Sequence, residues 1–94
     1  MDIDISELIN FTEKELESYA IEKQFTDNQL DELAKYLYEL GEIEQEKNNP
    51  QEALKYFDAA KKLLATADKI SQTYSFERAA FKQEIDEILH SLSN

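Results

Sequence analysis

Cysteine is absent from this chain of 94 residues, and histidine occurs only once. Without cysteine, the chain can form neither a disulfide framework nor a metal site with thiolate ligands. It also lacks any apolar run close to the ~20 residues that a transmembrane helix needs. Its acidic start, Met1-Asp2-Ile3-Asp4, is the opposite of the basic segment that opens a signal peptide. We therefore expect a soluble cytoplasmic protein.

Basic residues are scarce, and the shortage is confined to the first half of the chain. Residues 1–46 hold 14 acidic residues against 3 lysines, a net charge of −11, whereas residues 47–94 hold 7 acidic against 7 basic residues. Binding to nucleic acid or to an anionic membrane surface requires clustered lysine and arginine, so we expect neither. The acidic half forms either a solvated, solubilising face or a surface that attracts a basic partner.

The rest of the composition is that of a folded domain. Hydrophobic residues make up 41% of the chain and aromatic residues 11%, which is too much apolar surface for a disordered acidic tail. A chain of this length forms one domain around one small core. We expect a single domain over residues 1–94.

Three similar sites in the first third of the chain predict helix starts. Each has a hydrophobic residue before a capping residue, and an acidic or amide residue three positions after the cap, which is the pattern of a capping box with a hydrophobic staple. The capping residues are Asp4, Thr12 and Thr26. Because the first two lie close together, either a short helix precedes Thr12 or one helix covers residues 4–24. We favour the single helix, with a kink at Asn10-Phe11.

A second helix is expected over residues 27–47 and a third from Pro50. Apolar residues recur every three or four positions in both, and the wide apolar arc of the second predicts neighbours on two sides. Asn49 is expected to cap the third helix, with Pro50 as its first residue. Glu44 shares the angular sector of the core leucines, so its carboxylate must be exposed, paired or neutralised. We favour exposure near the turn.

The apolar spacing of the third helix continues to Leu92, and neither glycine nor proline occurs after Pro50. One continuous helix of about 42 residues is therefore compatible with the pattern. However, the polar cluster at 71–75 is poor in helix-forming residues, and so long a helix would leave its second apolar part without intramolecular contacts. We predict a break at 71–75, with helices over 50–70 and 75–92.

The centre of the chain carries a resemblance to a known family. Its residues are Leu37-x-x-Leu40-Gly41, then Asn49-Pro50, then Ala53-x-x-x-Phe57-x-x-Ala60. Over about residues 34–67 the chain resembles one tetratricopeptide (TPR) repeat, a helix-turn-helix unit of ~34 residues. Leu37 stands where the family prefers Trp, and Glu44 where it prefers Tyr. The only glycine, Gly41, costs about 1 kcal/mol inside a helix, which a close approach of the partner helix at Phe57 would explain.

No catalytic apparatus is visible in the sequence. Glu87-x-x-His90 has the spacing found in di-metal helical bundles, but those need a second such pair, and the chain has one histidine. We therefore assign His90 to a helix C-terminus, where its positive charge complements the helix dipole. Neither a phosphate-binding glycine motif nor a nucleophile–histidine–acid triad can be assembled. We expect no enzyme activity, no cofactor and no metal.

In TPR arrays the ligand groove is lined mainly by the first helix of each repeat. The resemblance therefore implies a partner-binding face that consists of Lys35, Tyr38, Glu42, Gln45 and Glu46. TPR domains that clamp a C-terminal carboxylate use lysines and asparagines on this face, so Tyr38 and Glu42 argue against an acidic ligand. The other interpretation of these residues is a solvated surface, because a single repeat forms an incomplete groove.

We predict an all-α fold, a right-handed antiparallel array or small bundle of three or four helices with a central TPR-like hairpin. The predicted function is a non-catalytic protein–protein interaction module that binds another protein or peptide, a basic one being an option. One alternative is a homodimer joined through the apolar stripe at 74–92. Another is a small acidic inhibitor that covers the basic surface of a nucleic-acid-binding protein.

Overall fold

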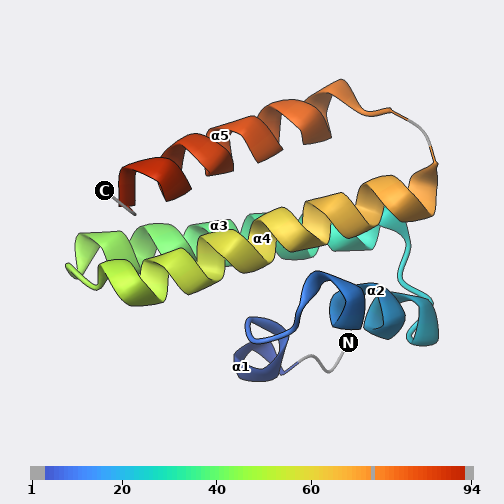
Figure 1. Cartoon of the computed structure of the whole chain (residues 1–94), viewed down its shortest axis with the longest axis horizontal. Coiled ribbons are helices and arrows are strands. Elements are labelled where there is room, and N and C mark those ends of the chain that lie inside the picture. The colour runs from blue at the N-terminus through green and yellow to red at the C-terminus, as the bar shows by residue number, and fades with distance from the viewer. Residues whose placement is uncertain (1–3, 73, 93–94) are drawn as a thin grey trace.

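The computed structural model describes residues 4–72 and 74–92, and all the regular structure in these ranges is helical. The helices are α1 (Ile5–Leu8), α2 (Glu13–Glu22), α3 (Asp27–Glu46), α4 (Pro50–Ser71) and α5 (Phe76–Leu92). The predicted all-α class is confirmed. α3 and α4 form a central antiparallel hairpin, with α5 along one side and α1 and α2 on the other (Figure 1).

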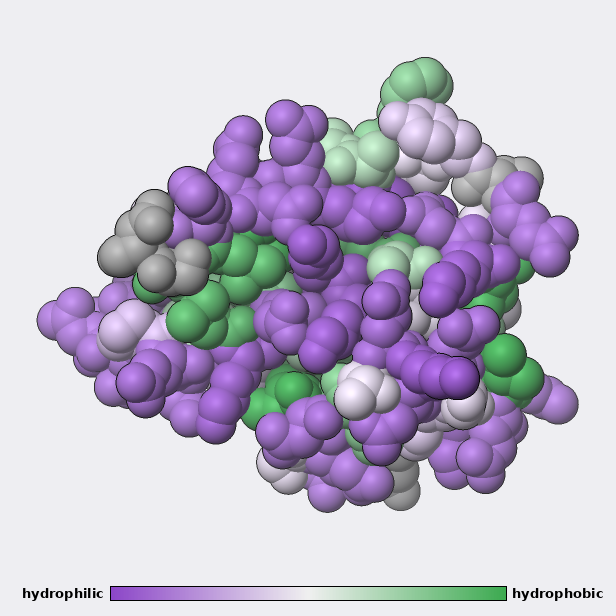
Figure 2. Space-filling model, in the orientation of Figure 1, coloured by the Kyte–Doolittle hydropathy of each residue, from purple (hydrophilic) through white to green (hydrophobic). Residues whose placement is uncertain are grey.

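The core lies inside the hairpin and reaches both flanking parts. Its largest fully buried hydrophobic side chains are Leu16, Leu30, Leu37, Phe57, Leu63, Leu64 and Ile85. Each such side chain contributes ~1.5–3 kcal/mol through its removal from water. The outer surface is largely hydrophilic, and apolar surface shows mainly in patches between the elements (Figure 2).

Gly41 on α3 lies against the ring of Phe57 on α4. A Cβ atom at this position would lie 2.8 Å from both Cε1 and Cζ of Phe57, which is closer than real Cβ atoms approach other atoms. Phe57 is fully buried, as are Ala53 and Ala60 on the same helix. The predicted close approach of helices at the single glycine is therefore confirmed.

The single helix predicted over 4–24 is wrong, because the chain forms α1 and α2 instead. Thr12 starts the second of them: its Oγ1 accepts the N–H of Glu15 at 3.1 Å, and Glu15 Oε1 accepts the N–H of Thr12 at 2.9 Å. The turn between the helices brings the rings of Phe11 and Tyr19 to a centroid distance of 5.4 Å. On one straight helix Phe11 would point away from the apolar face. The cap at Thr12 thus begins a new helix.

The other two predicted capping residues are confirmed as well. Asp4 Oδ1 accepts the N–H groups of Ser6 at 3.1 Å and Glu7 at 3.4 Å. Thr26 Oγ1 accepts the N–H of Gln29 at 3.1 Å, and the Gln29 side chain accepts the N–H of Thr26 in return. The staple residue expected before Asp4, at position 3, lies outside the described residues. Local sequence alone therefore places the starts of α1, α2 and α3.

The turn between α3 and α4 differs in one detail from the prediction. Pro50 is the first residue of α4, but Asn49, at the N-cap position, makes no side-chain capping bond. Its Nδ2 instead donates to Glu44 Oε2 at 3.0 Å. The side chain of Glu44 is only 18% exposed, so this bond supplies a partner that its carboxylate needs. The exposure favoured for Glu44 from the sequence is therefore wrong, and its carboxylate is paired instead.

The break predicted at 71–75 is confirmed, with residue 73 outside the described part. Gln72 follows α4 in the left-handed conformation, with φ 57°. At the start of α5 the hydroxyl oxygen of Ser75 accepts the N–H of Arg78 at 3.1 Å. The chain therefore reverses here, and α5 returns antiparallel to α4 (Figure 1).

The apolar stripe at 74–92 packs within the chain. Ile85 is fully buried, and three more of its residues pack against the core, namely Phe81, Ile88 and Leu92. The side chains that the homodimer alternative needs at its seam are thus engaged inside the chain. Tyr74, at the start of the stripe, stays exposed and contacts the exposed ring of Phe76 at a centroid distance of 4.9 Å.

Candidate functional site: the groove between α3 and α5

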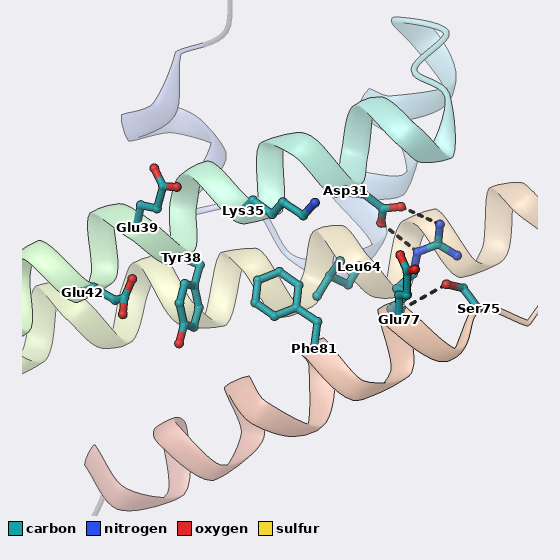
Figure 3. Close-up of a pocket in the computed structure, with 10 residues that line it drawn as sticks. Asp31, Lys35, Tyr38, Glu39, Glu42, Leu64, Ser75, Glu77 and Phe81 are labelled. Carbon is teal, nitrogen blue, oxygen red and sulfur yellow. Dashed lines mark hydrogen bonds and ion pairs between the residues drawn. The ribbon is translucent and has the colours of Figure 1, made fainter.

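A groove of about 360 Å³ lies between α3 and α5, with α4 behind it (Figure 3). Its lining residues are Asp31, Lys35, Tyr38, Glu39 and Glu42 on α3, Leu64 on α4, and Ser75, Glu77, Arg78 and Phe81 at and within α5. Helices support both walls, and a site on helices is held more firmly than one on loops. The groove is therefore a preformed surface.

Tyr38 is the central side chain of the groove. Its ring packs edge-on against the rings of Phe57 and Phe81, with centroid distances of 5.4 and 5.2 Å. Burial raises the pKa of the Tyr38 hydroxyl, and the carboxylates of Glu84 and Glu42 raise it further. The hydroxyl thus stays protonated at neutral pH. Glu42 belongs to α3 and Glu84 to α5, so both helices carry a carboxylate whose charge acts on Tyr38.

Arg78 closes one end of the groove. Its guanidinium donates two hydrogen bonds of 2.8 Å to the two carboxylate oxygens of Asp31, and its side chain is only 4% exposed. Further hydrogen bonds reach Asp68 at 3.1 Å and Asp27 at 3.4 Å, and Lys82 also binds Asp68. The bonds to Asp31 raise the pKa of Arg78 despite its burial. A two-pronged arginine–carboxylate pair fixes orientation as well as distance, so Arg78 ties α5 to α3 and α4.

The sequence did not predict that Arg78 is buried and paired, because a charged residue within an apolar stripe is interpreted as an interruption of the stripe. A signal was nevertheless present, since a buried arginine needs carboxylate partners. Asp27 and Asp31 are four residues apart and therefore share one face of α3. Which acidic residues face Arg78 depends on how α5 packs on the hairpin, and local spacing does not contain that information.

Three of the five predicted binding residues line the groove: Lys35, Tyr38 and Glu42. Gln45 and Glu46 are exposed but lie outside the groove, further along α3. The wall formed by α5 was not predicted, because the TPR resemblance covers only the hairpin. Phe81, Glu77 and Ser75 are the lining residues that this wall adds.

The rim of the groove is acidic. Within the described ranges, Glu39, Glu42 and Glu77 form no ion pair. Arg78 is already bound to aspartates, which leaves Lys35 as the unpaired cation of the described lining. Residues 47–94 are neutral in sum, yet α5 contributes Glu77 to the lining of the groove. The negative charge here therefore comes from both halves of the chain.

A metal-binding group is not assembled in the part of the chain that the structure describes. It holds no group of three or more His, Asp or Glu side chains that could bind a metal ion. His90 lies in the last turn of α5, the position assigned to it from the sequence. No helix in the described ranges is long and apolar enough to cross a membrane.

Comparison with known proteins gives no match: no family model fits the chain, and neither a curated protein nor a solved structure matches it. The assignment of a site therefore depends on the geometry and chemistry of the groove. The TPR resemblance of the hairpin stays a prediction.

Proposed function

We propose that this protein is a non-catalytic protein–protein interaction module that binds its partner in the groove between α3 and α5. One observation carries the proposal: a preformed groove has an aromatic floor at Tyr38 and Phe81 and a rim of carboxylates without ion-pair partners among the described residues. Apolar pockets with a few convergent polar groups are where proteins commonly bind their ligands.

The hairpin supports the TPR-like part of this proposal. Gly41 approaches Phe57 between two small residues of α4, as the resemblance implied. The first helix of the hairpin lines the groove with Lys35, Tyr38 and Glu42. α5 provides the second wall that a single repeat lacks. A cytoplasmic location remains part of the proposal and rests on the composition.

Site-specific photocrosslinking tests the proposal without assuming the chemistry of the partner. Benzoylphenylalanine is placed at Lys35, which is exposed and lines the groove, in the full chain inside its native cell. The matched control carries it at Glu32, an exposed position on the same helix that does not line the groove. We expect discrete adducts with another protein at position 35 and none at position 32.

The adducts also separate the alternatives. An adduct with the mass of two copies of this chain would assign the groove to self-association. Equal adducts at both positions, or none at position 35, would contradict the proposed binding site.

A further inference from the structure

We infer that the groove receives an arginine side chain of its partner, whose guanidinium lies between the carboxylates of Glu42 and Glu84 and whose stem lies along Tyr38 and Phe81. This inference rests on the proposed function and adds the chemistry of the partner. It makes the ligand a basic segment of another protein.

The chain's own Arg78 shows how this groove holds a guanidinium. At that end an arginine from α5 reaches the Asp31 carboxylate on α3 with two hydrogen bonds of 2.8 Å. Asp68 and Asp27 accept further hydrogen bonds from the same guanidinium, at 3.1 and 3.4 Å. An acidic wall of α3 is thus bridged to α5 by a planar cation.

The other end of the groove is also acidic, and no lysine or arginine of the described residues pairs with its carboxylates. Glu42 and Glu84 form no ion pair among the residues that the structure describes. The rings of Tyr38 and Phe81 are in contact across the groove, at a centroid distance of 5.2 Å. Glu42 follows Tyr38 by four residues on α3 and Glu84 follows Phe81 by three on α5, so each carboxylate lies one turn along its helix from this contact. The effect of both carboxylates on the pKa of Tyr38 agrees with this placement. Like charges placed near one partly buried point repel each other, and a cation between them removes the repulsion.

The floor of the groove favours arginine over lysine. Arginine stacks on aromatic rings and presents a rigid fork of donors that can reach carboxylates on two sides, whereas lysine offers a compact point charge. A volume of about 360 Å³ lies at the low end of the range of ligand pockets. The groove therefore accommodates one long side chain with its flanking backbone, and not a whole helix.

The test is a titration of the isotopically labelled full chain, followed by NMR. The probe is a short capped peptide, Leu-Arg-Leu, and its control is the same peptide with citrulline, which keeps the shape of arginine without its charge. We expect the arginine peptide to shift the resonances of Tyr38, Phe81 and their neighbours. Citrulline should weaken binding about tenfold, as the loss of a charged hydrogen bond does.

Matched variants locate the charges that matter. Glu42→Gln and Glu84→Gln should each weaken binding of the arginine peptide several-fold and reduce its salt dependence. Glu32→Gln on α3 and Glu87→Gln on α5 are the controls, since both residues are exposed and lie six residues from Tyr38 and Phe81, on another face of the same helix. These controls should bind as the unmodified chain does.

Three outcomes would overturn the inference. The arginine and citrulline peptides could bind equally well, the control variants could weaken binding as much as Glu42→Gln and Glu84→Gln do, or the peptide could shift only resonances of residues outside the groove. Equal loss in the controls would mean that overall negative charge, and not this pair, attracts the peptide. If crosslinking at position 35 still gave a partner in any of these cases, the groove would remain a protein-binding surface with a different ligand chemistry. If it gave none, the proposed function itself would fail.

Discussion

At the scale of single residues, Gly41 sets the distance between α3 and α4. Glycine is unfavourable in a helix interior, by about 1 kcal/mol relative to alanine. Here it leaves space for the ring of Phe57, which would otherwise contact a Cβ atom at 2.8 Å. Because that ring is fully enclosed, it has little room to move.

We expect Gly41→Leu to lower the free energy of unfolding by about 1–3 kcal/mol, because overpacking outweighs the gain in helix propensity. The control is Gln45→Leu, one turn further along α3 at an exposed position, which should change stability by less than about 0.5 kcal/mol. Urea unfolding measures both. A Gly41→Leu variant as stable as the original chain would contradict the close packing described for this position.

At the scale of elements, α5 packs on the hairpin through an apolar face and one buried charge. Ile85 is its fully buried apolar residue, and Arg78 is its buried charged residue. The outer face of the helix is polar except at its start, where Phe76 is exposed. The orientation of α5 relative to α3, and hence the shape of the groove, therefore depends strongly on Arg78.

Arg78→Met should cost about 2–3 kcal/mol, less than the roughly 3–5 kcal/mol of a fully buried pair, because Asp31 and Asp68 keep 27% and 33% of their side-chain exposure. Arg78→Lys keeps the positive charge but lacks the planar guanidinium that binds both carboxylate oxygens of Asp31. It should therefore lower the free energy of unfolding by less than Arg78→Met does, but should not restore the original stability. Hydrogen exchange should show α5 losing protection before the α3–α4 hairpin does. If Arg78→Met were as stable as the original chain, the ion pairs of Arg78 with the aspartates would not be what holds α5 in place.

At the scale of the whole molecule, the ionic cluster links stability to pH through Asp68. Burial raises the pKa of Asp68, but hydrogen bonds from Lys82 and Arg78 outweigh burial and hold the pKa below its ordinary value of 3.8. A carboxyl whose pKa is lower in the folded state stabilises the fold above its unfolded pKa. That stabilisation is lost as the pH falls through the folded pKa.

The chain should therefore be more stable than Asp68→Asn above about pH 5, and the difference should shrink as the pH falls through the folded pKa of Asp68. Urea unfolding at a series of pH values measures this difference. Asp86→Asn is the control, because the ion pair of Asp86 with Lys61 lies on the surface and should contribute less than about 1 kcal/mol at any pH. A difference for Asp68→Asn that persisted unchanged at low pH would contradict the assigned role of its carboxylate.

The sequence by itself determined the features that depend on near neighbours along the chain. Thr26 with Gln29, Pro50, and the polar cluster before Phe76 place the boundaries of the three long helices, because capping and helix propensity act within a few residues. The close helix contact at Gly41 could also be predicted from the sequence, since a single glycine within the apolar face of a helix indicates that another helix packs closely there.

Tertiary structure alone decided the features that depend on which helix faces meet. The two capping residues Asp4 and Thr12 lie so close together that the sequence was compatible with either one helix or two. In the structure the segment forms two helices, and the second of them packs against α4. The partners of Arg78 lie up to 51 residues away in the chain. Phe81 contacts Tyr38 only because α5 folds back along the hairpin. Periodicity tells which face of a helix is apolar, but the partner of that face depends on the packing of side chains between helices.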